Sequence, residues 1–418
     1  MAAGWWQIRQ LGDLRRESIP FLGWWTLLFL LFVLTASWAV HCYRKPGVPG
    51  ERQALWMVLI GALLARWILL PLAPTLSDDI YRYLWDGRVQ LAGLNPYGYA
   101  PADPVLAPLR DAAWLLINHR DIATIYPPVC QWLFRLAAMV APTLQAQKIA
   151  FLLWDLATCA LLIVVLPSWG YSPVLSLIYA WHPLIVTEFA ASGHNDALGI
   201  FWLLLGLWLW TRRRRAWAAV AWGIGALAKI APAMMLIWLL ADRSRRRHAL
   251  WFVLTVILGY APFLGMLDRA ALGLNHYAGQ WEFNSSLYVL MAWLVREPWI
   301  ARTLCMGLWG ACAVWLGRRY EDPRRFAWTM TALAMLCSPV VEPWYVAWLV
   351  PLLCLYHRGP WLCFTGLVIL SYEVLAAQAA HGTWCIEPWA QWLEYAPLYA
   401  WLLFEWWGMR RTVDVGLI

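Results

Sequence analysis

Charged side chains are scarce in this sequence. Lys, Arg, Asp and Glu make up 13% of its 418 residues, whereas hydrophobic residues make up 62%. A soluble globular domain has about 25% charged residues, so this composition excludes a soluble enzyme and indicates an integral membrane protein. At roughly 20 residues per crossing, the apolar runs predict an all-α polytopic fold with about 11–13 transmembrane helices. We expect one membrane domain over residues 1–418.

Several chemical motifs are also missing. The chain has no GxGxxG, Walker A or HExxH motif, so a soluble enzyme that uses a nucleotide-linked sugar is not supported. Its nine Cys residues are scattered, without a CxxC pair or a paired His and Cys spacing. This pattern predicts neither a metal site nor a disulfide framework. We therefore expect no metal and no cofactor.

Apolar runs are what the sequence has in abundance. Those that predict membrane segments cover residues 22–41, 54–73, 148–166, 172–190, 197–210, 249–266, 299–317, 326–341, 344–356, 360–377 and 391–408. Short arginine-rich loops predict the cytoplasmic side; they are 212–215, 243–247, 318–325, 357–358 and 410–411. The loops that carry His194, residues 276–286 and Glu342 then fall on the opposite face.

The segment 216–241 joins two of these arginine clusters, so it should cross the membrane an even number of times. Pro232 removes a helix hydrogen bond and disfavours helix before it. One interpretation is a pair of half-helices that meet at Lys229 as a re-entrant hairpin, with the lysine in a cavity. The alternative is one kinked span whose lysine reaches the interface.

The longest polar stretch, 74–125, is the predicted outer catalytic loop. Asp79 to Leu91 places polar side chains on one face and apolar ones on the other, which predicts an amphipathic helix on the membrane surface. A second piece, Pro108 to Ile117, has a similar pattern. We expect 126–141 to be a partial span, because a full crossing would separate this loop from the His194 loop.

Two adjacent carboxylates, Asp78 and Asp79, open the polar stretch where interfacial water can reach them. Adjacent like charges raise one pKa and couple the two titrations. One carboxylate could therefore act as a general base while the other orients it or the substrate. They could equally cap the N-terminus of a helix, and the two roles are compatible.

Other polar residues are candidates for binding a phosphate or a sugar. Arg82 and Arg88 could bind phosphate oxygens or lie on a solvated helix face, and a lipid phosphate is an obvious partner for Lys229. The run from His194 to Asp196 could contact an acceptor or cap the span that follows. The candidate substrate-binding residues are Tyr81, Asp86, Asn95, Tyr126, His194, Asn195, Asp196, Tyr277, Trp281, Asn284, Glu342, Trp344 and Tyr345.

Together these pieces resemble the GT-C superfamily of integral membrane glycosyltransferases, and most closely the polyprenol-phosphate-mannose-dependent mannosyltransferases. The matching pieces are Ser77 to Tyr97, Ile117 to Pro128, His194 to Asp196, Lys229 to Pro232, Tyr277 to Ser286 and Pro343 to Tyr345. The resemblance covers most of the chain. It departs from the family pattern in one respect, since two predicted spans precede the acidic pair where many members have one.

The resemblance implies an inverting transfer of a hexose, with mannose as the first guess, from a polyprenyl-phosphate carrier to a lipid-anchored or cell-surface glycan. It implies that the acidic residue opening the first outer loop deprotonates the acceptor, a role assigned first to Asp78 and second to Asp79. Lys229, Arg82 or Arg88 should stabilise the departing phosphate. The resemblance also implies a bacterial inner-membrane protein with its active site on the extracytoplasmic face and no metal.

Two other classes of function remain as alternatives. A transporter or flippase of lipid-linked sugars should concentrate its charges near the bilayer midplane and show repeat symmetry. The polar residues instead cluster in the outer loops, and no repeat is evident. A membrane ligase or polymerase of glycans would share the lipid-linked donor but would join larger units.

Overall fold

The computed structural model describes residues 1–418 except 267–272, 274, 276, 383 and 416–418. His276, in the second polar loop, therefore lies outside the described residues. The described residues form helices, and their β-structure is limited to one isolated bridge between Phe283 and Val340. The predicted all-α fold is confirmed.

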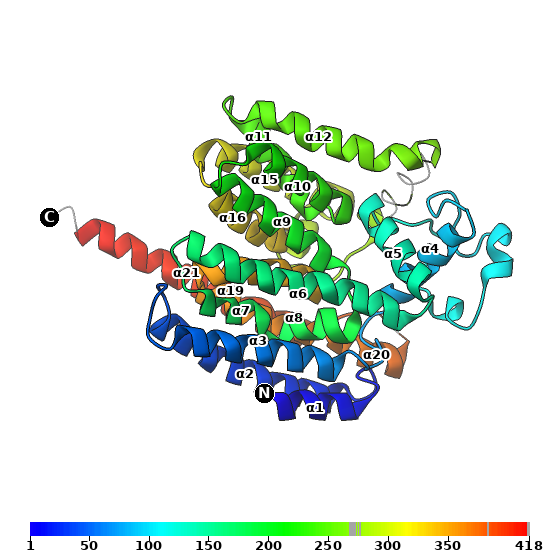
Figure 1. The fold of residues 1–418 in the computed structure, drawn as a ribbon, viewed down its shortest axis with the longest axis horizontal. Coiled ribbons are helices and arrows are strands. Elements are labelled where there is room, and N and C mark those ends of the chain that lie inside the picture. The colour runs from blue at the N-terminus through cyan, green and yellow to red at the C-terminus, as the bar shows by residue number, and fades with distance from the viewer. Residues whose placement is uncertain (267–272, 274, 276, 383, 416–418) are drawn as a thin grey trace.

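The helices form an elongated bundle (Figure 1). The first half contains α1 (Ala2–Leu11), α2 (Ser18–Cys42), α3 (Glu51–Leu69), α4 (Asp79–Leu91), α5 (Pro128–Val140), α6 (Leu144–Ser168), α7 (Leu177–Ala180), α8 (Pro183–Val186), α9 (Asp196–Thr211) and α10 (Arg215–Ala228). The second half contains α11 (Met234–Ala241), α12 (Arg246–Tyr260), α14 (Leu287–Val295), α15 (Pro298–Arg319), α16 (Pro323–Cys337), α17 (Pro343–Val346), α18 (Val350–Tyr356), α19 (Gly359–Leu367), α20 (Glu373–His381) and α21 (Pro388–Val415).

Six described helical stretches are long and apolar enough to cross a membrane: Ser18–Cys42, Glu51–Leu69, Leu144–Ser168, Arg246–Met266, Pro298–Arg319 and Gly359–Gln378. A pair bent by 60°, Pro173–Ala180 and Pro183–Ser192, would be a seventh. Shorter apolar helices are Pro128–Val140, Asp196–Thr211, Ala231–Ala241 and Pro343–Tyr356. The chain is a polytopic membrane protein, and the expected number of about 11–13 spans is reached only if the shorter helices also cross.

Helix α4 has the bounds that the sequence predicts, and it packs against α5 and α6 at one end of the bundle (Figure 1). A Cβ atom on Gly87 would lie 2.5 Å from the backbone oxygen of Phe134, so α4 and α5 touch backbone to backbone. Asp86, on the predicted polar face, is buried. Helix α4 is therefore a packed element of the fold and has no freely solvated polar face at Asp86.

The second amphipathic piece, Pro108 to Ile117, is not a helix. The chain forms two short 3-10 turns there, Pro104–Leu109 and Trp114–Leu116. Pro108 cannot donate a backbone hydrogen bond, and Asp111 accepts one from the backbone N–H of Trp114. Such side-chain bonds to the backbone compete with regular helix.

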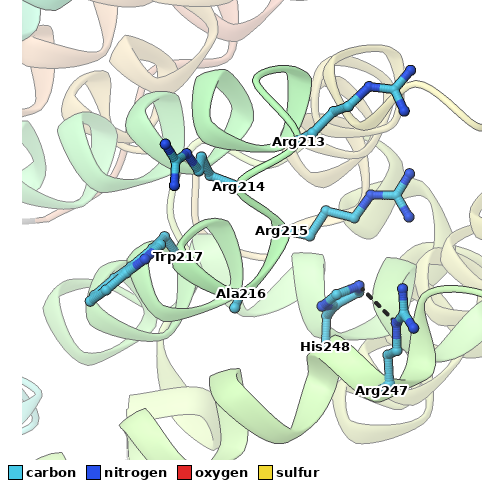
Figure 2. A pocket seen from close by; sticks show the side chains of 7 residues that line it. All are labelled: Arg213, Arg214, Arg215, Ala216, Trp217, Arg247 and His248. Atoms are coloured by element: carbon cyan, nitrogen blue, oxygen red, sulfur yellow. Dashed lines mark hydrogen bonds between the residues drawn. The ribbon is translucent and has the colours of Figure 1, made fainter.

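The helix of segment 216–241 breaks at Lys229. Helix α10 ends at Ala228, the backbone of Lys229 is extended, and a 3-10 turn containing Pro232 leads into α11. The two arginine clusters that flank the segment line one pocket (Figure 2). The chain therefore turns back at Lys229, as in the paired half-helix interpretation, and its depth in a membrane stays a prediction.

Buried polar side chains fix the approach to the acidic pair. The Lys148 ammonium donates to the backbone oxygens of Leu70 and Leu72, both at 2.7 Å, where α3 ends. Carbonyls at a helix C-terminus attract a cation. The backbone N–H of Leu14 donates to Thr75 Oγ1 at 2.9 Å. The N-terminal region and α6 thus hold the chain that enters Asp78.

The contact between α4 and α5 can be tested with two helical glycines. Gly87→Ala forces a methyl group against backbone, so we expect about 1–3 kcal/mol of destabilisation and a lower melting temperature in detergent. Gly307→Ala is the matched control, since a Cβ atom there meets nothing within 4 Å and alanine favours helix. Equal melting temperatures for the two variants would contradict the close packing.

Candidate active site

Asp78 and Asp79 point to different partners. Asp78 precedes α4, and its Oδ1 lies 3.0 Å from Arg15 Nη2 in a partly exposed ion pair. Asp79 is the first residue of α4, and its Oδ1 accepts a hydrogen bond of 3.3 Å from Asn118. The acidic pair is therefore divided: Asp78 pairs with Arg15 of the N-terminal region, whereas Asp79 faces another set of neighbours.

Those neighbours are two tyrosines and a glutamate from distant parts of the chain. Burial raises the pKa values of Tyr126, Tyr277 and Glu342, and the charge of Asp79 raises each of them further. For Glu342 the charge of Glu188 adds to the effect. Because this influence falls with distance, Asp79, Tyr126, Tyr277 and Glu342 lie near one another in one cluster.

Lys229 faces the same group of tyrosines. Its Nζ lies 6.0 Å from the ring centre of Tyr126 and 5.6 Å from that of Tyr345. The Tyr345 hydroxyl is 2.6 Å from that of Tyr277. Tyr126 and Tyr277 thus connect the surroundings of Asp79 with those of Lys229, and the three rings form an aromatic wall between the two charges.

The lysine is held by the residues that open α9. Its Nζ donates to Asn195 Oδ1 and to Asp196 Oδ2, both at 2.9 Å. Trp348 Nε1 donates to the other oxygen of Asp196 at 2.7 Å. Asp196 is fully buried, so its charge depends on this pairing. An ammonium has three N–H donors, and two of them are used here.

His194 lies between a glutamate and an indole. Its Nδ1 is 2.8 Å from Glu188 Oε2, and its ring stacks on Trp344 with centroids 4.0 Å apart. The Tyr372 hydroxyl donates to both oxygens of Glu188. Within the described part of the chain neither ring nitrogen of His194 makes an aligned hydrogen bond, although the residue is buried. A buried, unpartnered Nε2 is suited to a polar group of a substrate.

Glu188 is the residue that sequence reasoning missed. It stands inside the apolar run 172–190, where an ionisable residue is by default a functional hypothesis. By this criterion Glu188 is as strong a candidate as Lys229. The π-helical turn Thr187–Ser192 carries it, and Gly193 ends the turn in the left-handed region. This geometry returns the chain so that His194 lies over Glu188.

Several predicted site residues make their contacts within or beside the polar loop 74–125. Arg82 is buried, and it donates to Asp86 Oδ1 at 2.9 Å and to the backbone oxygen of Ile122 at 3.0 Å. Arg88 pairs with Asp111. The Asn95 side chain accepts a hydrogen bond from the backbone N–H of Tyr97 and so shapes a turn. Tyr81 lies near Asp78. Burial raises the pKa of Tyr81, and the charge of Asp78 adds a smaller rise.

The polar loop before α14 lies next to the loop between α16 and α17. Phe283 donates to the backbone oxygen of Pro339 and accepts from Val341, which aligns the two loops. The ring of Trp281 meets that of Tyr277 edge to face, with ring centres 4.4 Å apart. Asn284 is buried and donates to Glu394 Oε2 at 2.6 Å, so its amide holds α21. The structure therefore brings Tyr277, Trp281, Glu342, Trp344 and Tyr345 together and gives Asn284 a separate partner.

The described residues contain no cluster of metal-binding side chains. No three His, Cys, Asp or Glu side chains converge there in a way that could hold an ion. Lys229 is a cation beside this tyrosine cluster that could face an anionic substrate.

Comparison with known proteins extends these observations. A family model described as "Alpha-(1->6)-mannopyranosyltransferase, N-terminal domain" matches residues 2–242, a range that holds Asp79, Glu188, His194 and Lys229. The chain is also 24% identical over 399 residues to "Alpha-(1->6)-mannopyranosyltransferase A" of Mycobacterium tuberculosis (strain ATCC 25618 / H37Rv). This alignment covers 83% of the chain and 73% of the relative. No solved structure matches.

The crowding of carboxylates predicts a pH effect at Glu342. Its pKa is raised above the ordinary 4.5 in the folded state, so the folded state binds more protons than the unfolded chain between these two values. The free energy of unfolding should therefore fall as pH rises from about 4.5 toward the raised pKa of Glu342. Below about 4.5 Glu342 is protonated in both states, and its contribution no longer changes with pH.

Glu342→Gln removes this proton and should flatten the dependence of the melting temperature on pH above 4.5. Melting curves of the purified protein in detergent over a pH series measure it. The matched control is Glu297→Gln at an exposed glutamate, which should follow the wild type. A slope at Glu342→Gln as steep as that of the wild type would contradict the crowded site.

Proposed function

Since the chain belongs to the alpha-(1->6)-mannopyranosyltransferase family, we propose that this membrane mannosyltransferase takes its mannose from a polyprenyl-phosphate carrier. The acceptor is a lipid-anchored or cell-surface glycan, and the linkage that the family's name describes is an α-(1→6) bond. Membership of a transferase family displaces the transporter and flippase alternative. A ligase or polymerase of glycans would move larger units than the single mannose proposed.

The observation that supports this proposal is one cluster of tyrosines that neighbours both Asp79 and Lys229. A glycosyl transfer from a lipid phosphate needs a base for the acceptor hydroxyl and a cation for the leaving phosphate. Asp79 supplies the first and Lys229 the second. The aromatic rings of Tyr126, Tyr277 and Tyr345 suit the faces of a sugar between them.

In the proposed reaction Asp79 removes the proton of the acceptor hydroxyl as its oxygen attacks the anomeric carbon of mannose. The bond between that carbon and the phosphate oxygen breaks on the opposite side, which inverts the configuration. The electron pair leaves with the polyprenyl phosphate. Asp79 is preferred to Asp78 as the base because Arg15 already neutralises Asp78.

Lys229 is proposed to bind the phosphate with its remaining N–H, while Asn195 and Asp196 keep it in position. The unpartnered Nε2 of His194 is suited to a second contact with the phosphate or a sugar hydroxyl. Arg82 and Arg88 are not retained as phosphate ligands, because carboxylates within the loop occupy them. We propose that no metal or other cofactor takes part.

The proposed location is the bacterial inner membrane, with this site at its extracytoplasmic face. Positive charge concentrates on the cytoplasmic side of membrane proteins. The arginines at 213–215 and 247 line a pocket at the end of α10 away from Lys229, which supports an orientation with the site facing outward.

The first test separates the two aspartates. Asp79→Asn should lower the transfer of radiolabelled mannose from polyprenyl-phosphate mannose in proteoliposomes by about 10²- to 10⁴-fold, the usual loss of a general base. Asp78→Asn is the control, since its partly exposed pair with Arg15 contributes about 0–1 kcal/mol. Equal loss in both variants, or full activity in Asp79→Asn, would remove Asp79 as the base.

The second test concerns Lys229. Lys229→Met alone leaves Asp196 buried without a partner, so the double variant Lys229→Met/Asp196→Asn removes both charges and preserves the fold. Losing a hydrogen bond to a charged group costs about 1.5–3 kcal/mol, so KM for the donor should rise roughly 10- to 100-fold and kcat should change less. Unchanged kcat and KM in the double variant would show that the lysine does not bind the donor phosphate.

A further inference from the structure

A second concentration of positive charge lies at the other end of α10. The turn between α9 and α10 and the first turn of α12 line an open surface pocket of about 450 Å³. Figure 2 shows its lining, which comprises Arg213, Arg214, Arg215, Ala216, Trp217, Arg247 and His248. Helix α10 has 14 residues, which at 1.5 Å per residue separates this pocket from Lys229 by about 21 Å.

The charge of the pocket is not neutralised within the protein. No Asp or Glu lines it, and none of the ion pairs among the described residues uses Arg213, Arg214, Arg215 or Arg247. Elsewhere in the structure buried or half-buried arginines such as Arg66, Arg82 and Arg302 are paired with carboxylates. Arg213, Arg214 and Arg247 are exposed, so their charges are open to an anion from outside the chain.

The pocket has a rigid base. The guanidinium of Arg215 lies 5.3 Å from the ring centre of Trp210, and the ring of His248 meets the same indole edge to face at 5.5 Å. Trp210 in turn stacks on Trp222. In Figure 2 the side chains of Arg213 and Arg215 extend to one side of the α9–α10 turn, Arg247 points up from α12 on that side, and Arg214 points the other way.

Two helices also begin at the pocket. Helix α10 starts at Arg215 and α12 at Arg246, and a helix N-terminus carries partial positive charge and free N–H groups. Guanidinium groups bind phosphate oxygens in pairs. A phosphate group suits a pocket lined by several arginines beside two helix N-termini.

An exposed apolar stripe continues from the pocket. Arg247 shares one face of α12 with Trp251, Leu254 and Leu258, at spacings of three and four residues. The three apolar side chains are 48%, 40% and 70% exposed, and Trp217 is 64% exposed beside the pocket. Helix α12 lies in one of the apolar stretches long enough to cross a membrane. A molecule with a phosphate in the pocket and hydrocarbon along α12 would cover both features.

We propose that this pocket binds the phosphate of an anionic phospholipid, whose acyl chains lie along α12. The site is separate from the proposed donor site, since it lies at the opposite end of α10. The lipid supplies the missing counter-charge for the α9–α10 turn and the start of α12.

The experiment measures lipid binding to the full chain in detergent micelles by native mass spectrometry. Phosphatidylglycerol is the anionic probe, and phosphatidylcholine of the same chain length is the zwitterionic one. In Arg215→Gln/Arg247→Gln the Kd for the first phosphatidylglycerol should rise about 10-fold, because charge-assisted hydrogen bonds are lost. The matched control is Arg318→Gln/Arg319→Gln, which removes two exposed charges from the end of α15 outside the pocket.

A second variant, Leu254→Gln/Leu258→Gln, tests the hydrocarbon contact and should also weaken phosphatidylglycerol. An excess of inorganic phosphate should leave most of the lipid bound. The proposal is overturned if the pocket and control variants bind phosphatidylglycerol equally, or if phosphatidylcholine binds as tightly. It is also overturned if inorganic phosphate displaces the lipid while the leucine variant binds it normally, since the site would then hold a soluble anion. Binding is measured without mannosyl transfer, so failure here leaves the proposed enzyme function untouched.

Discussion

The contact of Lys229 with Asn195 and Asp196 determines the shape of the candidate site. A charged side chain inside a membrane domain is costly unless it is paired. The break at Lys229 and the start of α9 meet so that one ammonium satisfies a carboxylate and an amide. Pro232 favours the break between α10 and α11, and the pair of Lys229 with Asp196 holds that break against the start of α9. The aromatic wall of Tyr126 and Tyr345 is built around the same ammonium.

The sequence predicts local structure well wherever local chemistry determines it. The bounds of α4 follow from the acidic start and the spacing of its polar residues, and the break at Lys229 follows from Pro232. The pattern of 108–117 is amphipathic, but Pro108 and the hydrogen bond that Asp111 accepts from Trp114 favour short 3-10 turns there. Hydrophobic periodicity alone does not make a helix when the backbone has better partners.

The partners of the candidate site residues could not be predicted, because they come from distant parts of the chain. Asp78 and Asp79 are adjacent in the sequence, and distant partners distinguish them: Arg15, 63 residues before Asp78, and Asn118, 39 residues after Asp79. Arg82 was predicted to bind the donor phosphate and Asp86 the substrate; the structure shows that the two pair with each other and that Gln131 donates to Asp86. Pairing between charges is set by tertiary contacts, which one sequence without homologues does not reveal. Glu188 is different, since its isolation in an apolar run was visible from the start.

The two proposed phosphate sites use cations in opposite ways, and their functions explain the difference. Lys229 shares its charge with Asp196, which weakens its hold on an anion. An enzyme must release the polyprenyl phosphate after each transfer, and binding energy is better used on the transition state than on the product. The arginines of the pocket have no such partner, so they can retain a lipid through many turnovers. A compensated cation suits a phosphate that leaves, and an uncompensated cluster suits one that stays.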